Sequence, residues 1–527
     1  MKLHQKYLRI MKQRGCIVIL LIVNILCLTI CVAQIPSQTK LVSKPVQNVW
    51  YQSSTFSVWP LSHDDANTSL YLAQPYAKTK ADLLVSFDNE DMAFSTSKVQ
   101  FADKRYYSFV SFAGSDGRKR LLYIHDDAAP KVCYVHLDVL NPDIEQNKLV
   151  TDAAICSFEY EITYDIKFVQ SPDKDHFALL IYHQDYEDNI SKIHAMEFDQ
   201  NGNMEWENDI VPDIEEQYFR VYDYCLDNKE TLYMPFLSIN KDKDEKNITE
   251  QYLHLIRVDE DGMEMNRVEM DYGYAEHVMA KPTKDGNVIL CGFYKEGLDE
   301  LSTETGMFIY TFNPNTQEFI SEFHHGFGTD YFAKYPKTDR SVPHPVRPWH
   351  RLACKYIFET ENGEIVICGE HVSRVMKFSV DYGYYTYRTG DILVVRYTPG
   401  RSATVQIVPK NQNGISRTKP SDWKDVFVSF SAFVRHNDLY LIYNEAVDNI
   451  PYPGKGESVS ISPWGANNKY ASVCTKIAKN GTVSQQTLVK YVDDFHLYRD
   501  FLFADDNYYY VSLIQRNGIR FAKYPLP

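Results

Sequence analysis

Three segments of the chain combine aromatic, histidine and arginine side chains with proline or glycine: residues 323–351, 381–391 and 450–465. Their candidate ligand-binding side chains are His344, Arg347, Trp349, His350, Arg351, Tyr384, Tyr385, Tyr387, Arg388, Tyr452 and Trp464. Aromatic rings offer a large contact area at a small entropic cost, and their polar tips orient a ligand. Such segments predict binding of a sugar, a peptide or a partner protein. The alternative is that the rings pack beneath their own loops.

A second set of polar side chains precedes short apolar runs. It comprises Arg220, Asp223, His277, His496 and Arg499. If these runs are the innermost strands of a closed ring, the side chains surround one axis, where they can bind a polar ligand or act as acid and base. The alternative is the polar lining of a water-filled channel. Sequence alone selects no catalytic residue among them.

Known motifs for metals, nucleophiles and cofactors are missing. There is no CxxC pair, no Gly-x-Ser-x-Gly elbow, no phosphate-binding glycine loop and no dinucleotide fingerprint. His324 and His325, taken with His344 and His350, follow no established ligand spacing. The sequence therefore predicts neither a metal nor a cofactor.

The composition is that of an acidic globular protein. Of 527 residues, 44% are hydrophobic and 24% are charged, and the net charge is −15. Because the first 33 residues hold five basic residues and no acidic one, the remainder carries −20. A nucleic-acid partner is not expected, since phosphate binding requires a positive surface.

The N-terminus has the pattern of a signal peptide. Five lysines and arginines precede an apolar run over residues 16–32, and Cys31-Val32-Ala33 supplies the small residues for cleavage before Gln34. Residues 1–33 are thus predicted to be removed, leaving a secreted or periplasmic protein with no membrane span. The alternative is an uncleaved anchor. Seven cysteines then remain, most of them in apolar runs, and we interpret them as small buried hydrophobic residues.

From residue 106 onward, short apolar runs and polar turns repeat in a fixed order, which is typical of an all-β protein. Asn/Asp-Gly turns such as residues 199–202 and 259–262 favour antiparallel hairpins. Repeat units begin near residues 106, 178, 232, 288, 365, 439 and 508. Units of four strands that recur in this way predict a β-propeller.

We expect one propeller domain over residues 34–527, most simply with seven four-stranded blades; six or eight are the alternatives. An N-terminal strand from residues 34–100 should close the ring, with residues 69–72 and 83–87 as candidates. The repeat spacing and turns resemble secreted bacterial β-propeller proteins, many of them uncharacterised. The motifs that define better-known propeller groups are not present.

The leading functional hypothesis is an exported propeller that binds a carbohydrate, peptide or protein partner through a face with long aromatic loops. The loops over residues 321–349, 371–390 and 445–469 fall on one face, and the tight turns fall on the other. One alternative is a glycoside hydrolase or polysaccharide lyase that acts at the channel mouth. Another is a structural subunit of a cell-surface assembly.

Overall fold

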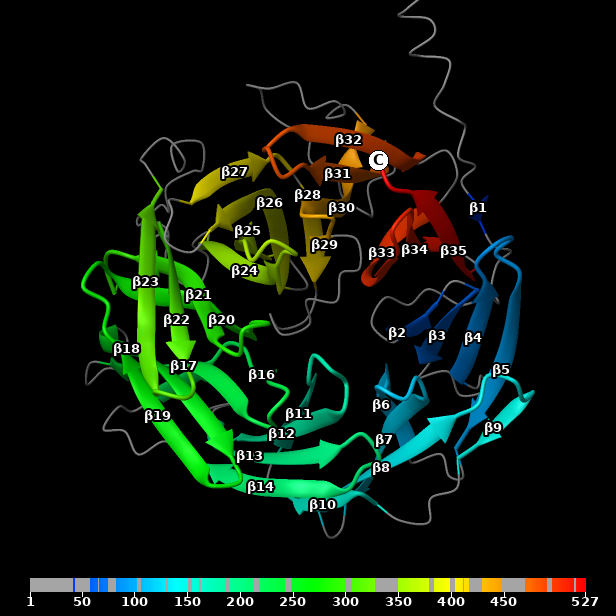
Figure 1. The fold of residues 1–527 in the computed structure, drawn as a ribbon, viewed down its shortest axis with the longest axis horizontal. Coiled ribbons are helices and arrows are strands. Elements are labelled where there is room, and N and C mark those ends of the chain that lie inside the picture. The colour runs from blue at the N-terminus through cyan, green and yellow to red at the C-terminus, as the bar shows by residue number, and fades with distance from the viewer. Residues whose placement is uncertain are drawn as a thin grey trace, which may run out of the picture.

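The computed structural model is an eight-bladed β-propeller over the residues that it describes (Figure 1). These residues are 41–42, 57–64, 66–73, 82–101, 106–128, 131–149, 154–160, 163–184, 190–211, 218–241, 248–298, 306–327, 349–378, 383–398, 403–410, 412–416, 429–447, 470–490, 495–515 and 518–527. The expected signal peptide lies outside them. Among the described residues, no helix has the length and apolar character needed to cross a membrane.

Each blade is a sheet of four main strands, and we number the blades in chain order. Blade 1 contains β2 (Ser57–His63), β3 (Asn67–Ala73), β4 (Asp82–Asp88) and β5 (Phe94–Gln100). Blade 2 contains β6 (Tyr106–Ala113), β7 (Lys119–Ala128), β8 (Lys131–Leu140) and β10 (Cys156–Glu159). Blade 3 contains β11 (Thr163–Gln170), β12 (His176–Gln184), β13 (Ile190–Asp199) and β14 (Met204–Ile210). Blade 4 contains β15 (Tyr218–Val221), β17 (Leu232–Lys241), β18 (Ile248–Asp259) and β19 (Gly262–Val268), and β16 (Cys225–Leu226) also pairs with β17.

The second half of the ring repeats this arrangement. Blade 5 contains β20 (Tyr274–Pro282), β21 (Val288–Lys295), β22 (Gly306–Asn313) and β23 (Glu318–Gly326). Blade 6 contains β24 (Trp349–Glu359), β25 (Ile365–Phe378), β26 (Gly383–Tyr397) and β27 (Thr404–Val408), and β28 (Gln412–Ser416) pairs with β26. Blade 7 contains β29 (Phe430–Arg435), β30 (Asp438–Ala446), β31 (Tyr470–Ile477) and β32 (Val483–Lys490). Blade 8 contains β33 (Phe495–Ala504), β34 (Tyr508–Gln515), β35 (Gly518–Pro525) and β1 (Leu41–Val42).

An N-terminal strand closes the ring, as the sequence predicted. Leu41 of β1 pairs antiparallel with Lys523 of β35, and Val42 pairs with Ala522. The candidates at residues 69–72 and 83–87 do not serve this purpose, because they belong to β3 and β4 of blade 1. The expected closing region therefore holds both the closing strand and a complete sheet. This additional sheet makes eight blades in place of the seven that we preferred.

Side chains that alternate between the two faces of each strand explain the packing between blades. In β12, Leu180 and Tyr182 pack with Met234 and other residues of blade 4, whereas Leu179 packs with blade 2. Successive side chains of a strand point to opposite faces, so a strand between two blades is apolar on both faces. Each of the eight interfaces in the described structure holds its own hydrophobic cluster.

Tight turns between the first and second strands connect neighbouring blades on one side of the ring. The backbone N–H of Asp173 in blade 3 donates to Asn228 Oδ1 in blade 4 (3.1 Å). The N–H of Asn362 in blade 6 donates to Asn437 Oδ1 in blade 7 (3.1 Å). The Asp/Asn-rich turns found in the sequence therefore contribute to the alignment of blades as well as to the reversal of the chain.

The expected long loop over residues 371–390 is mostly strand. β25 continues to Phe378 and β26 begins at Gly383, and the two pair from Phe378 with Gly383 back to Ile365 with Tyr397. Valine, threonine and tyrosine dominate this segment and favour extended backbone. An elongated hairpin thus replaces the expected loop.

All seven described cysteines are free thiols, and six of them are buried. This agrees with their interpretation as small hydrophobic residues. Burial also raises the pKa of Cys156 to about 12. Such a thiol is protonated at neutral pH and is a poor nucleophile.

A buried ion pair within blade 6 lies against blade 7. Lys410 Nζ contacts Glu370 Oε1, and both side chains are fully buried. The same ammonium group donates to Thr389 Oγ1 and Gln412 Oε1 (both 2.9 Å). Ser429 Oγ donates to the other oxygen of Glu370 (2.6 Å). Burial is the largest single influence and would raise the pKa of Glu370, but the charges of Lys410 and Lys355 and the hydrogen bonds from Lys410 and Ser429 together outweigh it, and the pKa is lowered.

Replacing Lys410 should therefore strongly destabilise the protein. The Lys410→Met variant leaves Glu370 as a buried charge without its partner, and we expect the free energy of unfolding to fall by about 3–5 kcal/mol. The control is Lys192→Met, which removes an exposed ion pair with Asp209 and should cost about 0–1 kcal/mol. Denaturant unfolding followed by fluorescence measures both. Equal losses in the two variants would contradict the structural importance of the buried pair.

Candidate functional site

The first strand of each sheet lies nearest to the centre of the ring, as β6, β11, β20, β24, β29 and β33 show (Figure 1). Polar residues expected around the axis are on or beside these strands. Arg220 is on β15, Asp223 lies between β15 and β16, and His277 is on β20. His496 and Arg499 are on β33.

The residues from the aromatic segments are divided among several places. Trp349, His350 and Arg351 are on β24, the first strand of blade 6. The candidates Tyr384, Tyr385, Tyr387 and Arg388 are on β26, the third strand of the same blade. His344, Arg347, Tyr452 and Trp464 lie outside the described residues.

Asp223 is the candidate whose surroundings change its chemistry most. Its Oδ2 accepts a hydrogen bond from the backbone N–H of Ala280 in blade 5 (3.1 Å), so the carboxyl reaches across the interface between blades 4 and 5. Burial raises the pKa of Asp223 to about 6, although this hydrogen bond and one from Tyr224 act in the opposite direction. A carboxyl of this kind exchanges its proton near neutral pH, as general acids and bases do.

Two tyrosines and a second carboxylate accompany Asp223. Burial is the largest cause that raises the pKa values of Tyr182 and Tyr224; Tyr224 raises that of Tyr182 next, and the negative charges of Asp165 and Asp223 raise both. Asp165 is exposed on β11, where it forms an ion pair with Lys167. Blades 3 and 4 thus contribute two carboxylates and two phenols to one neighbourhood.

Blade 5 adds a positioned histidine. His277 has a positive φ of 48° at an irregularity in the pairing of β20 with β21, and its ring lies 5.5 Å from that of Tyr222. Tyr222 donates to Glu276 Oε2 (2.9 Å), and Glu276 Oε1 forms a buried ion pair with Lys295 (2.9 Å). These contacts hold Tyr222, and with it the ring contact to His277, in a defined place.

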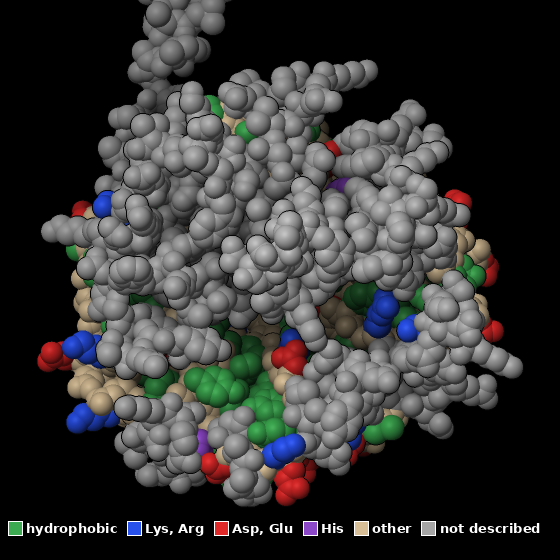
Figure 2. All heavy atoms as spheres, turned by 180° about the vertical axis from the view of Figure 1, so that it is seen from behind, with side chains coloured by type: hydrophobic (Ala, Val, Ile, Leu, Met, Phe, Trp, Pro, Cys, Tyr) green, Lys and Arg blue, Asp and Glu red, His purple; other side chains and the backbone are tan. Residues whose placement is uncertain are grey.

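We give the name inner-strand cluster to Asp165, Tyr182, Tyr222, Asp223, Tyr224 and His277, together with Arg220, which lies on β15 two residues before Tyr222 in sequence. It offers carboxylate acceptors, phenol donors and one exposed guanidinium group. From the side opposite to Figure 1, hydrophobic side chains gather below the centre, beside acidic and basic ones (Figure 2). Polar groups next to apolar surface suit a ligand with many hydroxyl groups.

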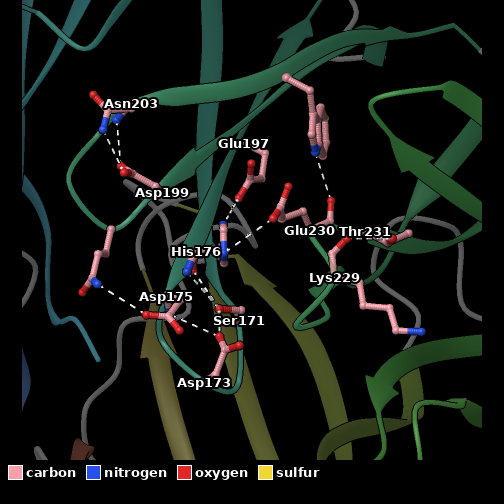
Figure 3. Close-up of polar contacts among 12 residues, drawn as sticks. Ser171, Asp173, Asp175, His176, Glu197, Asp199, Asn203, Lys229, Glu230 and Thr231 are labelled. Carbon is pink, nitrogen blue, oxygen red and sulfur yellow. Dashed lines mark hydrogen bonds and ion pairs between the residues drawn. The ribbon is translucent and has the colours of Figure 1, made fainter. Parts of the chain in front are cut away.

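A further polar cluster, which sequence analysis did not single out, lies between blades 3 and 4. It consists of His176, Glu197 and Glu230 (Figure 3). Burial raises the pKa of Glu197 to about 7, although His176 opposes this shift. The three residues lie far apart in the sequence on a strand start, a third strand and a turn, so no local motif reveals them. The only sequence signal is Glu197 itself, a glutamate between the apolar residues Met196 and Phe198 of β13.

Comparison with known proteins assigns no family. No protein-family model matches the chain, and no curated protein matches it either. Among solved structures, a polysaccharide lyase, Uly1, matches over 93% of both chains with 9% identity and a TM-score of 0.41. An oligogalacturonate lyase in complex with manganese matches over 90% of this chain and 98% of its own, with 13% identity and a TM-score of 0.33.

A third match is the β-propeller domain of the Trilobed protease from Pyrococcus furiosus. It covers 68% of this chain and 94% of that domain, with 8% identity and a TM-score of 0.33. Identities and scores of this size carry nothing about activity, and the propeller assignment here rests on the strand pairing.

The raised pKa of Asp223 predicts a pH-dependent stability. Between about pH 4 and pH 6 the folded state keeps a proton that the unfolded chain has lost, so this carboxyl lowers stability as the pH rises. The Asp223→Asn variant keeps an acceptor for Ala280 and lacks the charge. We expect its stability relative to wild type to increase from pH 4 to pH 7, measured by denaturant unfolding at both values.

The matched control for this experiment is Asp285→Asn. The pKa of Asp285 is lowered, chiefly by the hydrogen bond from Thr283. Its carboxylate therefore stabilises the fold above the unfolded pKa, and the benefit is lost as the pH falls. The control variant should lose stability relative to wild type at pH 7 and recover it at low pH. If Asp223→Asn changed the stability by the same amount at both pH values, this would contradict the raised pKa of Asp223.

Proposed function

We propose that this protein is an exported β-propeller that binds a carbohydrate, or a similarly hydroxyl-rich ligand, at the inner-strand cluster and does not turn it over. The observation that carries the proposal is Asp223, a half-buried carboxyl whose pKa is raised to about 6, placed among tyrosines near the axis. Carboxylates and phenols form directional hydrogen bonds with sugar hydroxyls, and tyrosine rings pack against sugar faces.

The surrounding charges are consistent with this ligand class. The chain carries a net charge of −15, which disfavours polyanionic ligands such as nucleic acid. Arg220 is an exposed cation on the inner strands and can orient a polar group of the ligand.

A carbohydrate-active enzyme is the second candidate, and one observation favours it. Asp165 and Asp223 come from neighbouring blades and both raise the pKa values of Tyr182 and Tyr224, so two carboxylates share one neighbourhood. Glycoside hydrolases use two carboxylates separated by about 5–10 Å, one of which has a raised pKa. Asp223 would be the acid in such a reaction.

Ligand binding is tested by titrating the protein with neutral, acidic and amino-sugar oligosaccharides under isothermal calorimetry. The Arg220→Ala variant removes a charged hydrogen-bond donor and should weaken binding roughly 10- to 100-fold. The control is Arg267→Ala, an exposed arginine that lies over Tyr252 in the outer half of blade 4 and should leave affinity unchanged. If Arg220→Ala and Arg267→Ala bound the ligand with equal affinity, the inner-strand cluster would not be the binding site.

The same oligosaccharides separate binding from catalysis. A binding protein leaves them intact during long incubation, and Asp223→Asn alters affinity alone. An enzyme shortens them, and Asp223→Asn abolishes product formation while ligand is still bound. Product analysis by chromatography distinguishes these outcomes.

Export predicts a defined mature N-terminus. Cleavage after Ala33 should produce a chain that starts at Gln34, detectable by mass spectrometry of protein from the extracytoplasmic fraction of the source cells. A chain that retains residues 1–33 and sediments with membranes would show the uncleaved anchor instead.

A further inference from the structure

The cluster of His176, Glu197 and Glu230 lies at the end of the apolar interface between blades 3 and 4. His176 begins β12, and Glu197 is a diagonal neighbour of it on β13, since Glu197 pairs with Ala178. Ala178 packs in the hydrophobic core between blades 3 and 4. The side chains of His176 and Glu197 lie on the same face of the sheet as Ala178, so they also face blade 4. Glu230 belongs to the turn before β17 and approaches from blade 4 (Figure 3).

The imidazole of His176 lies between the two carboxylates. Its Nδ1 is 2.9 Å from Glu197 Oε1, and its Nε2 is 3.6 Å from Glu230 Oε1. The side chain of Glu197 is 0% exposed, that of His176 20% and that of Glu230 43%. The cluster therefore has a buried end at Glu197 and an end open to solvent at Glu230.

Glu197 has a buried oxygen that its surroundings do not satisfy. Oε1 contacts His176, but Oε2 is buried and has no hydrogen-bond partner among the described residues. A buried carboxylate without sufficient partners is costly, so such an atom indicates a missing ligand. Lys229, the nearby cation, points away from the cluster (Figure 3).

Equivalent positions in blades 6 and 7 hold a cation that reaches the next blade. Glu364 and Arg396 in blade 6 have the same diagonal relation and form an ion pair at 2.6 Å. Arg396 also donates to the backbone oxygens of Asn437 (3.2 Å) and Ile477 (3.0 Å) in blade 7. In blade 7, Lys476 pairs with Asp438 (3.1 Å) in the same relation.

Blade 3 reverses this arrangement. Its third strand presents the carboxylate of Glu197 where blades 6 and 7 present Arg396 and Lys476. The next blade adds the carboxylate of Glu230 where blade 7 presents the backbone oxygen of Asn437. An imidazole and two carboxylates thus occupy a position that contains a fixed positive charge in blades 6 and 7.

We propose that His176, Glu197 and Glu230 bind one divalent transition-metal ion, which joins blades 3 and 4. One ligand atom from each residue can be chosen so that all lie within 4.8 Å of one another. Tetrahedral ligands at about 2.1 Å from a metal are about 3.4 Å apart, so small side-chain rotations complete the site. Binding through both oxygens of Glu197 would also satisfy its buried Oε2.

The ligand types select the ion. Two carboxylates balance the charge of a divalent cation, and a neutral imidazole favours zinc, manganese or a related metal over calcium and magnesium. The open side at Glu230 leaves room for a water molecule as a further ligand. The backbone of Glu230 is held by blade 3, because its carbonyl oxygen accepts a hydrogen bond from the indole N–H of Trp206 on β14 (3.0 Å).

Calorimetry on the tag-free protein, stripped with EDTA and titrated with Zn²⁺, Mn²⁺ and Ca²⁺ in turn, tests this site. We expect one Zn²⁺ or Mn²⁺ per chain, no comparable binding of Ca²⁺, and a higher melting temperature with the metal. The Glu230→Gln variant changes a solvent-facing ligand, keeps the fold and should weaken binding roughly tenfold or more. His176→Ala should abolish it.

The control variant is Glu205→Gln, which removes an exposed negative charge near Glu197 but no ligand. It should bind the metal as wild type does. Absence of binding by wild type, or equal affinity of wild type and Glu230→Gln, would overturn the proposal. So would a preference for Ca²⁺, because the imidazole would then have no role.

Discussion

Every sheet of this propeller depends on apolar contact with a neighbour on each of its two faces. In β21, all residues from Val288 to Lys295 are buried, and β17 is buried over most of its length. An isolated blade would expose two hydrophobic faces to water, at a cost proportional to their area. Neighbouring blades remove both faces at once, and the ring as a whole removes the faces that an open array would leave at its ends.

Charged groups inside this structure occur where the apolar interfaces need a specific alignment. Lys410 and Glu370 form an ion pair in blade 6, and Ser429 of blade 7 donates a hydrogen bond to Glu370; Lys295 and Glu276 of blade 5 bind one another near the axis. Apolar side chains tolerate small displacements between sheets, whereas a buried ion pair with further hydrogen bonds permits few geometries. The inner-strand cluster depends on this alignment, because Asp223 of blade 4 is held by the backbone of blade 5.

Local patterns in the sequence predicted most strands and turns, but neither the elongated hairpin of β25 and β26 nor the relations between blades. Asn/Asp-Gly turns and apolar runs identified the repeat, because hairpins depend on neighbouring residues. Blade 1 was missed since its strands begin earlier than the clear repeat, and we assigned them to ring closure. The surroundings of Asp223 were not predictable, because its burial and its contact with Ala280 arise from a different blade. The same holds for Glu197, whose partners are 21 and 33 residues away in sequence.

The closing strand has a consequence for how the chain folds. Leu41 pairs with Lys523, so the contact that completes blade 8 joins residues almost a full chain length apart. A contact of this separation forms late, since its loop must first be closed at an entropic cost. During synthesis, blade 1 is available long before its neighbour β35 exists, and its Leu70, Phe87 and Val58 remain without Phe521 and Tyr510. The nascent protein therefore carries an adhesive apolar surface until its last residues emerge, and it depends on protection from aggregation for that whole interval.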